Sequence, residues 1–222
     1  MPAPASRKLV IYGTRGFARE IPQLIEDIAA NGAAVTCLGF LAEDGIRENS
    51  ALLDLPLLGN ADWLDGKPDV LVTIGVETTK SRQVVAREIE NRFGPRFVTL
   101  QHPRAWIGKR VTIGAGSQVC AGVHATTDIV IGRHVQLHVG CIVGHDAEIG
   151  DFTTIAPGAI VSGRVRIGPG TFVGTGAIIL TDVKVGDGVT ITAGAVVTKD
   201  VPDGVTVAGV PARIIAGSAR LT

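Results

Sequence analysis

The 222-residue sequence predicts a mixed fold, with a small Rossmann-like α/β domain (residues 1–101) followed by a parallel β-helix of hexapeptide repeats (residues 102–222). Two observations lead to this prediction. The first half alternates short apolar segments with apolar residues at helical spacing, and a glycine turn follows the first segment, as in a doubly wound sheet. The second half repeats an aliphatic residue every six positions without a break in register.

The first half should contain four strands and two helices. The expected strands are 8–12, 35–41, 70–74 and 97–100, and the expected helices lie between Ala18 and Ile28 and over residues 78–93. Gly13-Thr14-Arg15-Gly16 follows the first strand, where such a turn lets a phosphate approach backbone N–H groups. The turn has no third glycine, so a hydride-carrying dinucleotide is not implied. A tight turn without a ligand is the alternative interpretation.

The second half has two interleaved rows of small or aliphatic residues. Every sixth residue from Ile107 to Val197 is Ile, Leu or Val, with Ala125 as the exception. A second row, four positions further on, runs from Val111 to Val201 and is small or β-branched. A triangular coil takes three hexads, so residues eighteen apart should stack. A β-sandwich is the alternative, but its strands vary in length and lose phase at each turn.

Composition excludes several classes of function. The formal net charge is zero and no basic run with interleaved aromatic residues is present, so nucleic acid is not an expected partner. No apolar stretch approaches the roughly 20 residues of a membrane span, and Met1–Lys8 lacks the apolar core of a signal peptide. Cys37, Cys120 and Cys141 lack metal-ligand spacing, and Cys141 belongs to the inward row. We therefore expect a cytoplasmic protein.

Several short motifs are distributed over nearly the whole chain. They are Tyr12–Phe17, Gly39–Asp44, Thr73–Gly75, His102–Pro103, Gly144–Asp146, Ile149–Phe152, Gly194–Pro202 and Gly209–Arg213. Together with the domain order, they resemble the bacterial nucleotide-sugar acetyltransferase family, which includes bacillosamine-type N-acetyltransferases and sialic-acid O-acetyltransferase-like proteins. The resemblance implies that the coils are left-handed, against the usual right-handed crossover rule.

The same resemblance implies roles for individual residues. It places a nucleotide sugar at the glycine turn and nearby positions, namely Gly13, Arg15, Gly16, Phe17, Glu43 and Gly75. It places acetyl-CoA along the coils, with Thr154, Thr175 and Ala193 near the pantetheine arm and Lys199 and Arg213 facing the phosphates. It also implies a homotrimer with acetyl-CoA between subunits. His145 falls on the catalytic base of the family.

The residues around His145 fit that role. An amine or hydroxyl that attacks a thioester must lose a proton, and a neutral imidazole suits this transfer near pH 7. His145 follows the inward Val143 close to a corner, and Gly163, eighteen residues later, leaves space beside the ring. Asp146 could orient the imidazole, although adjacent strand residues point to opposite faces. The alternative is a solvated charged column of Asp128, Asp146 and Arg164.

The histidines raise zinc binding as a competing possibility, because zinc carbonic anhydrases also use left-handed β-helices. Their pattern has two histidines separated by four residues and a third far upstream. His134 and His138 are separated by three residues and His145 follows both, so no metal site is expected. We expect His138 in a pocket wall or at the surface, and His124 and His102 in a corner and in the linker.

The expected function is transfer of acetyl from acetyl-CoA to a nucleotide-linked sugar, with N-acetylation of an amino sugar for surface polysaccharide or glycan favoured. Sugar O-acetylation and a catalytically silent nucleotide-sugar-binding scaffold are the alternatives. Both stay open because the sequence departs from the usual family pattern. The family often has His, Asn, an acidic residue and Asp where this chain has Thr154, His138, Gly144 and Ala42.

Overall fold

The computed structural model describes residues 6–43 and 55–215. Asp44, the last residue of one family motif, lies outside these ranges. The chain divides into two compact units, Met1–Pro103 and Arg104–Thr222, and each is described by itself. In the described part of the chain, no helix is long and apolar enough to cross a membrane.

The first unit is built on a parallel sheet of four strands in the order β3-β2-β1-β4. The strands are β1 (Arg7–Tyr12), β2 (Val35–Leu41), β3 (Leu57–Gly59) and β4 (Leu71–Ile74). Leu9, Val10 and Ile11 of the central β1 are fully buried. Such a continuous apolar run is typical of a parallel strand covered on both faces.

The helices of this unit begin and end at residues that suit their positions. They are η1 (Gly16–Arg19), α1 (Ile21–Ala30), η3 (Ala61–Leu64) and α2 (Thr79–Phe93). The single helix expected near residue 20 is therefore two, because Pro22 lacks an N–H and favours a helix start. The Thr78 hydroxyl accepts from the Ser81 N–H at 3.4 Å and caps α2, which ends at Gly94.

The last strand expected in this unit is largely absent. Residues 97–100 do not form one strand: Phe97 makes a single parallel bridge with Val72, and β5 covers only Leu100–Gln101. The short β4 limits this pairing to two backbone hydrogen bonds, from Val72 N–H to the Arg96 carbonyl and from Val98 N–H to the Val72 carbonyl. β3 and η3 were not expected from the sequence.

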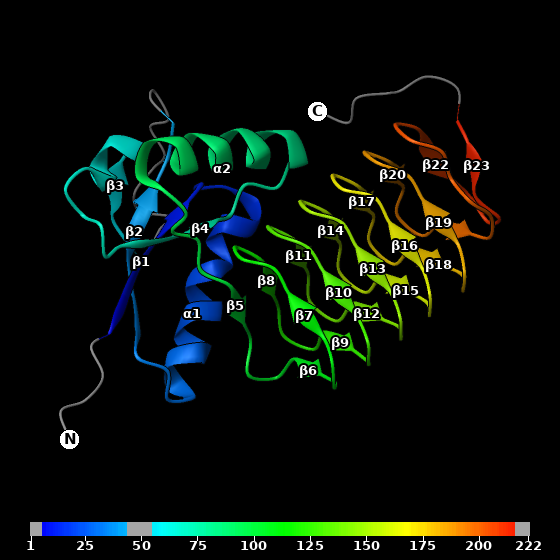
Figure 1. Cartoon of the computed structure of the whole chain (residues 1–222), viewed down its shortest axis with the longest axis horizontal. Helices are drawn as coiled ribbons and strands as arrows, with labels where there is room; N and C mark the ends of the chain where they lie inside the picture. The colour runs from blue at the N-terminus through cyan, green and yellow to red at the C-terminus, as the bar shows by residue number, and fades with distance from the viewer. Residues whose placement is uncertain (1–5, 44–54, 216–222) are drawn as a thin grey trace. The chain divides into compact units, whose positions relative to one another are not determined.

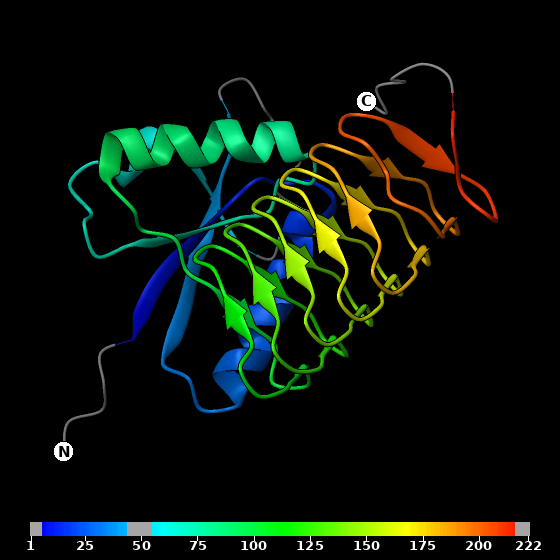
Figure 2. The same cartoon turned by 45° about the vertical axis from the view of Figure 1, so that its right-hand side comes forward.

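The second unit is a stack of coils built from short strands (Figures 1 and 2). Face 1 contains β7 (Thr112–Ile113), β10 (Val130–Ile131), β13 (Glu148–Ile149), β16 (Arg166–Ile167) and β19 (Lys184–Val185). Face 2 contains β8 (Gln118–Val119), β11 (Gln136–Leu137), β14 (Thr154–Ile155), β17 (Phe172–Val173), β20 (Thr190–Ile191), β22 (Thr206–Ala208) and β23 (Arg213–Ile214). Face 3 contains β6 (Trp106–Ile107), β9 (His124–Ala125), β12 (Ile142–Val143), β15 (Ile160–Val161), β18 (Ile178–Ile179) and β21 (Val196–Val197).

Residues eighteen apart pair in parallel, as the repeat predicts; Val143, for example, pairs with Val161. The large aliphatic row is buried from Val119 to Val197. Polar members of the second row bond to backbone inside the coil, as when the Ser117 hydroxyl donates to the Gly132 carbonyl and accepts from the Val135 N–H, both at 2.9 Å. Buried hydroxyls are tolerated because they are hydrogen-bonded. These features fit a left-handed β-helix built from hexapeptide repeats.

Candidate active site

One edge of the β-helix, where face 3 turns into face 1, carries a column of charged side chains, and we call it the His145 edge. Its column positions are Arg110, Asp128, Asp146, Arg164 and Asp182, and all have left-handed φ angles between 56° and 66°. At the edge between faces 2 and 3, the corresponding left-handed positions are all glycines, namely Gly122, Gly140, Gly158, Gly176 and Gly194. A side chain in this conformation costs about 1–2 kcal/mol, and strained positions of this kind cluster at functional sites.

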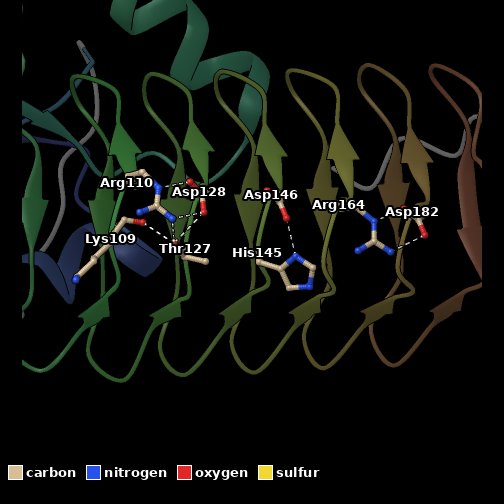
Figure 3. A network of polar contacts seen from close by, with 8 residues as sticks. All are labelled: Lys109, Arg110, Thr127, Asp128, His145, Asp146, Arg164 and Asp182. Carbon is tan, nitrogen blue, oxygen red and sulfur yellow. Dashed lines mark hydrogen bonds and ion pairs between the residues drawn. The ribbon is translucent and has the colours of Figure 1, made fainter.

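His145 and Asp146 form a hydrogen-bonded pair on this edge. His145 Nδ1 lies 2.7 Å from Asp146 Oδ2, and about half of each side chain is exposed (Figure 3). The left-handed φ of Asp146, 58°, bends the chain so that neighbouring residues do not point to opposite faces. Asp146 can therefore orient the imidazole.

The imidazole lies directly against Gly163 of the next coil. A Cβ at Gly163 would lie 2.5 Å from His145 Nε2 and 2.7 Å from Cε1, so the ring occupies the space that glycine leaves. No hydrogen bond joins Nε2 to another residue of the described ranges. When Nδ1–H donates to Asp146, Nε2 carries the lone pair that can accept a proton.

The arginines of this edge are engaged with other carboxylates. Arg164 bonds Asp182 through Nε to Oδ1 at 2.6 Å and Nη2 to Oδ2 at 2.9 Å, and Figure 3 shows its guanidinium directed to Asp182. Arg110 forms the same paired contact with Asp128. Hydrogen bonds from these guanidinium groups lower the pKa of Asp182 and of Asp128. Arg164 thus does not neutralise Asp146 by direct contact.

The other histidines lie in different surroundings. His134 is buried and stacks on the Phe152 ring with centroids 4.8 Å apart. His124 is exposed, 6.0 Å from the Trp106 ring, and the buried His102 contacts Asp27 Oδ2 through Nε2 at 2.8 Å. Within residues 6–43 and 55–215, no group of three or more His, Cys, Asp or Glu could hold a metal ion.

All but one of the predicted acetyl-CoA residues lie away from the His145 edge, and the exception is Lys199. Thr175 and Ala193 are exposed at the edge between faces 2 and 3, where the Gly194 N–H donates to the Thr175 carbonyl. The half-buried His138 lies at the same edge. Thr154 is buried on β14 of face 2, and Lys199 and Arg213 are exposed after β21 and in β23. In one chain, face 3 therefore separates Thr175, Ala193 and His138 from His145, whereas Lys199 lies on the His145 edge, three coils from His145.

In the first unit, the predicted sugar-nucleotide residues gather at the carboxyl ends of β1 and β4. Gly13, Gly16 and the buried Phe17 form the turn into η1, and Arg15 in the turn is exposed. Gly75 follows β4 and is so close to η1 that a Cβ there would lie 2.6 Å from the Ala18 Cα.

Glu77, which the sequence reasoning missed, occupies this turn. Its Oε1 accepts from the Phe17 N–H at 2.9 Å, and a Cβ at Gly16 would lie 1.7 Å from that oxygen. The fully buried Arg82 donates to the Val76 and Glu77 carbonyls at 3.0 Å each and holds the loop, and burial lowers the pKa of Arg82 to about 9. Glu77 is an acidic residue two positions after Gly75, which directly follows a parallel strand, and this was the sequence signal that could have identified it.

Glu43, at the carboxyl end of β2, lines a cavity of 230 Å³. The lining residues are Tyr12, Glu43, Asn60, Ala61, Asp62, Glu88 and Arg92. Arg92 bonds Asp62 at 2.5 Å and Glu88 at 3.2 Å, so the one cation of this lining is already paired with two carboxylates. The lining offers acceptors for hydroxyl or N–H donors rather than a phosphate site.

Comparison with known proteins relates this geometry to a family. A profile of the bacterial transferase hexapeptide family (six repeats) matches residues 128–163 and 164–199. Among solved structures, a histidine-to-asparagine mutant of perosamine N-acetyltransferase from Caulobacter crescentus, in complex with CoA and GDP-perosamine, is 28% identical with a TM-score of 0.83 and covers 97% of this chain and 99% of its own. WeeI from Acinetobacter baumannii AYE is 32% identical with a TM-score of 0.81 and covers 93% of this chain and 99% of its own.

The acetyltransferase domain of PglB from Neisseria gonorrhoeae FA1090 is also 32% identical, covers 95% of this chain and 100% of its own, and has a TM-score of 0.81. This chain belongs to the bacterial nucleotide-sugar acetyltransferases. It is therefore an acyltransferase. A search of curated protein sequences gives no significant match.

In this acetyltransferase Cys37 and Cys141 are unsuited to form an acyl-enzyme. Cys141 is fully buried, and burial raises its pKa to about 12. The half-buried Cys37 has its pKa raised to about 11 for the same reason. Both remain thiols near neutral pH, and the thiolate is the nucleophilic form.

The acetyltransferase also has a structural reason for glycine at position 144. A Cβ at Gly144 would lie 2.6 Å from the Gly163 backbone nitrogen, inside van der Waals contact. An acidic side chain could enter here only if the two coils moved apart. In this chain, the carboxylate beside His145 is supplied by Asp146 instead.

Proposed function

We propose that this acyltransferase moves the acetyl group of acetyl-CoA to the amino group of a nucleotide-linked sugar, with His145 as general base. The hydrogen bond between His145 Nδ1 and Asp146 Oδ2 is the observation that carries the proposal. Support also comes from relatives: PglB was solved with acetyl coenzyme A, and perosamine N-acetyltransferase with CoA and GDP-perosamine.

The chemistry follows from the orientation of the imidazole. The sugar amine attacks the thioester carbonyl, His145 Nε2 takes a proton from the nitrogen, and the tetrahedral intermediate expels the CoA thiolate. Asp146 holds the Nδ1–H tautomer and stabilises the imidazolium that forms. The proton on His145 can then pass to the departing thiolate, which returns the base to its neutral form.

In this proposal the first domain, residues 1–101, is Rossmann-like and binds the nucleotide sugar. The strand order β3-β2-β1-β4 supports it, because ligands of open parallel sheets bind at the carboxyl ends of the strands. The cavity lined by Glu43 would take the nucleoside, whose hydroxyl and N–H groups suit carboxylate acceptors. A phosphate reaches the Phe17 N–H only after displacing the Glu77 carboxylate.

The second domain, residues 102–222, binds acetyl-CoA in a homotrimer in this proposal. His145 lies at one edge of face 3, and Thr175 and Ala193 lie at the other, so a groove between neighbouring chains can join them. The outward residues of face 3 are apolar apart from His124: they are Trp106, Ile142, Ile160, Ile178 and Val196. Exposed apolar surface of this kind suits a subunit interface. Thr154, Lys199 and Arg213 complete the proposed cofactor contacts.

The test measures thiol release from acetyl-CoA with a panel of nucleotide sugars. We expect turnover only with amino sugars, and a loss of about 10²–10⁴ in kcat for His145→Ala with little change in the KM for acetyl-CoA. Turnover with non-amino sugars would point to O-acetylation, and binding without thiol release to a silent scaffold. An activity loss under about threefold in the variant would remove His145 from the role.

A further inference from the structure

Arg164 lies between two carboxylates of the His145 edge and bonds one of them. Asp146 and Asp182 are each eighteen residues away, which is one coil to either side along the column (Figure 3). Stacked coils are about 4.8 Å apart, well within the reach of an arginine side chain. Both hydrogen bonds of the guanidinium nevertheless go to Asp182.

We propose that Asp182 is a positioning residue for acetyl transfer: by holding Arg164, it leaves the Asp146 carboxylate to His145. This inference rests on the proposed role of His145 as the base. Asp182 makes no hydrogen bond to His145 or Asp146; the charge of His145 makes only the smallest contribution to the lowered pKa of Asp182, after Arg164, and in this proposal Asp182 acts through Arg164.

Asp146 and Asp182 compete for the Arg164 guanidinium. The charge of Asp146 helps to raise the pKa of Arg164, after the larger effects of Asp182, so Asp146 attracts this guanidinium from its present position. On the other side, Arg110 is bonded to Asp128 and also feels the charge of Asp146. Half of the Arg164 side chain is exposed, so it can rotate without disturbing the core.

Loss of the Asp182 carboxylate would change the partner of Arg164. The guanidinium would turn to Asp146, the other carboxylate whose charge acts on it, and form the paired contact that arginine favours. His145 Nδ1–H would lose its acceptor, and neither the ring orientation nor the Nδ1–H tautomer would be held. Nε2 would then carry the lone pair in only part of the molecules.

Asp182→Asn is the suitable variant because asparagine, like aspartate, tolerates the left-handed backbone at this position. We expect kcat to fall about tenfold, with the KM for acetyl-CoA changed by no more than about twofold. Asp182→Ala should behave in the same way. Arg164→Gln added to Asp182→Asn should restore kcat to within about twofold of the wild type, because the competing cation is gone.

The matched control is Asp128→Asn. It also removes a carboxylate and frees an arginine of the same edge, but Arg110 is two coils from Asp146 rather than one. We expect it to retain at least about half of the wild-type kcat. Thermal unfolding of each variant monitors the fold; Asp182 is exposed and Asp128 is partly exposed.

A second measurement does not depend on activity. In ¹⁵N NMR spectra of histidine-labelled protein, His145→Ala assigns the His145 ring among the five histidines. The wild-type ring should show the Nδ1–H tautomer, Asp182→Asn a mixture, and the double variant Nδ1–H again. A tautomer that changes as expected while kcat does not would support the positioning role and overturn the assignment of His145 as base. An unchanged tautomer in Asp182→Asn, or a double variant as impaired as the single one, would overturn the positioning role.

Discussion

Replacing Gly163 by alanine should inactivate the enzyme while leaving the β-helix folded. The new methyl group would lie 2.5 Å from His145 Nε2 and 2.7 Å from Cε1. Non-bonded heavy atoms prefer separations of about 3.5 Å, so the ring must move by about 1 Å. The φ of Gly163 is not left-handed, so alanine introduces no backbone strain.

The expected loss of kcat follows from the displacement of the His145 ring. The obstructed atoms belong to a half-exposed side chain, so the imidazole can rotate away at little cost in stability. That rotation takes Nδ1 away from Asp146 and Nε2 away from its position for proton transfer. A misplacement of about 1 Å can cost about 100-fold in rate, so we expect kcat to fall by about that factor.

The assay combines thiol-release kinetics with thermal unfolding. Gly163→Ala should lower kcat while Tm and the KM for acetyl-CoA stay close to wild-type values. Gly163→Ala in a His145→Ala background is the matched control, because no ring is present to collide with, and it should match His145→Ala in both Tm and residual activity. Wild-type kcat in Gly163→Ala would refute the placement of the ring and with it the geometry proposed for the base.

Three further predictions concern other parts of the molecule. Gly16→Val should raise the KM for the nucleotide sugar and leave the KM for acetyl-CoA unchanged, because its side chain collides with Glu77; a rise confined to acetyl-CoA would contradict the assignment of the turn. Co-expression of inactive His145→Ala and Thr175→Trp chains should restore activity in mixed trimers if two chains build each groove; inactive mixed trimers, or a monomer in solution, would exclude this. Ellman's reagent at pH 8 should modify Cys141 at a measurable rate only after denaturation, because burial raises its pKa to about 12 and its thiolate fraction is small; rapid native labelling would contradict this.

The hexad repeat predicts most of the second unit because its structural rule is local. Every sixth side chain points inward, so the sequence specifies strand length, the buried row and the eighteen-residue stack, and the pairing of Val143 with Val161 confirms it. The first unit follows less directly from sequence. Whether residues 97–100 form a strand depended on how many backbone groups of β4 were available for pairing. β4 is short, and the pairing is limited to one bridge.

The candidate active site was likewise predictable from the sequence only in part. The sequence alone placed His145 beside Asp146 and put Gly163 one coil away. Whether the two side chains meet depended on the left-handed backbone at Asp146, which residue type permits but does not require.

Tertiary structure also determines which of two partners at the same sequence separation a residue contacts. Arg164 is eighteen residues from Asp146 and from Asp182, and only the folded side-chain geometry selects Asp182. Glu77 reaches the Phe17 N–H across 60 residues of chain, a contact that no local pattern encodes. Repeats and neighbouring residues can be read from sequence because backbone geometry fixes their spacing, whereas contacts between distant side chains depend on how the elements that carry them pack.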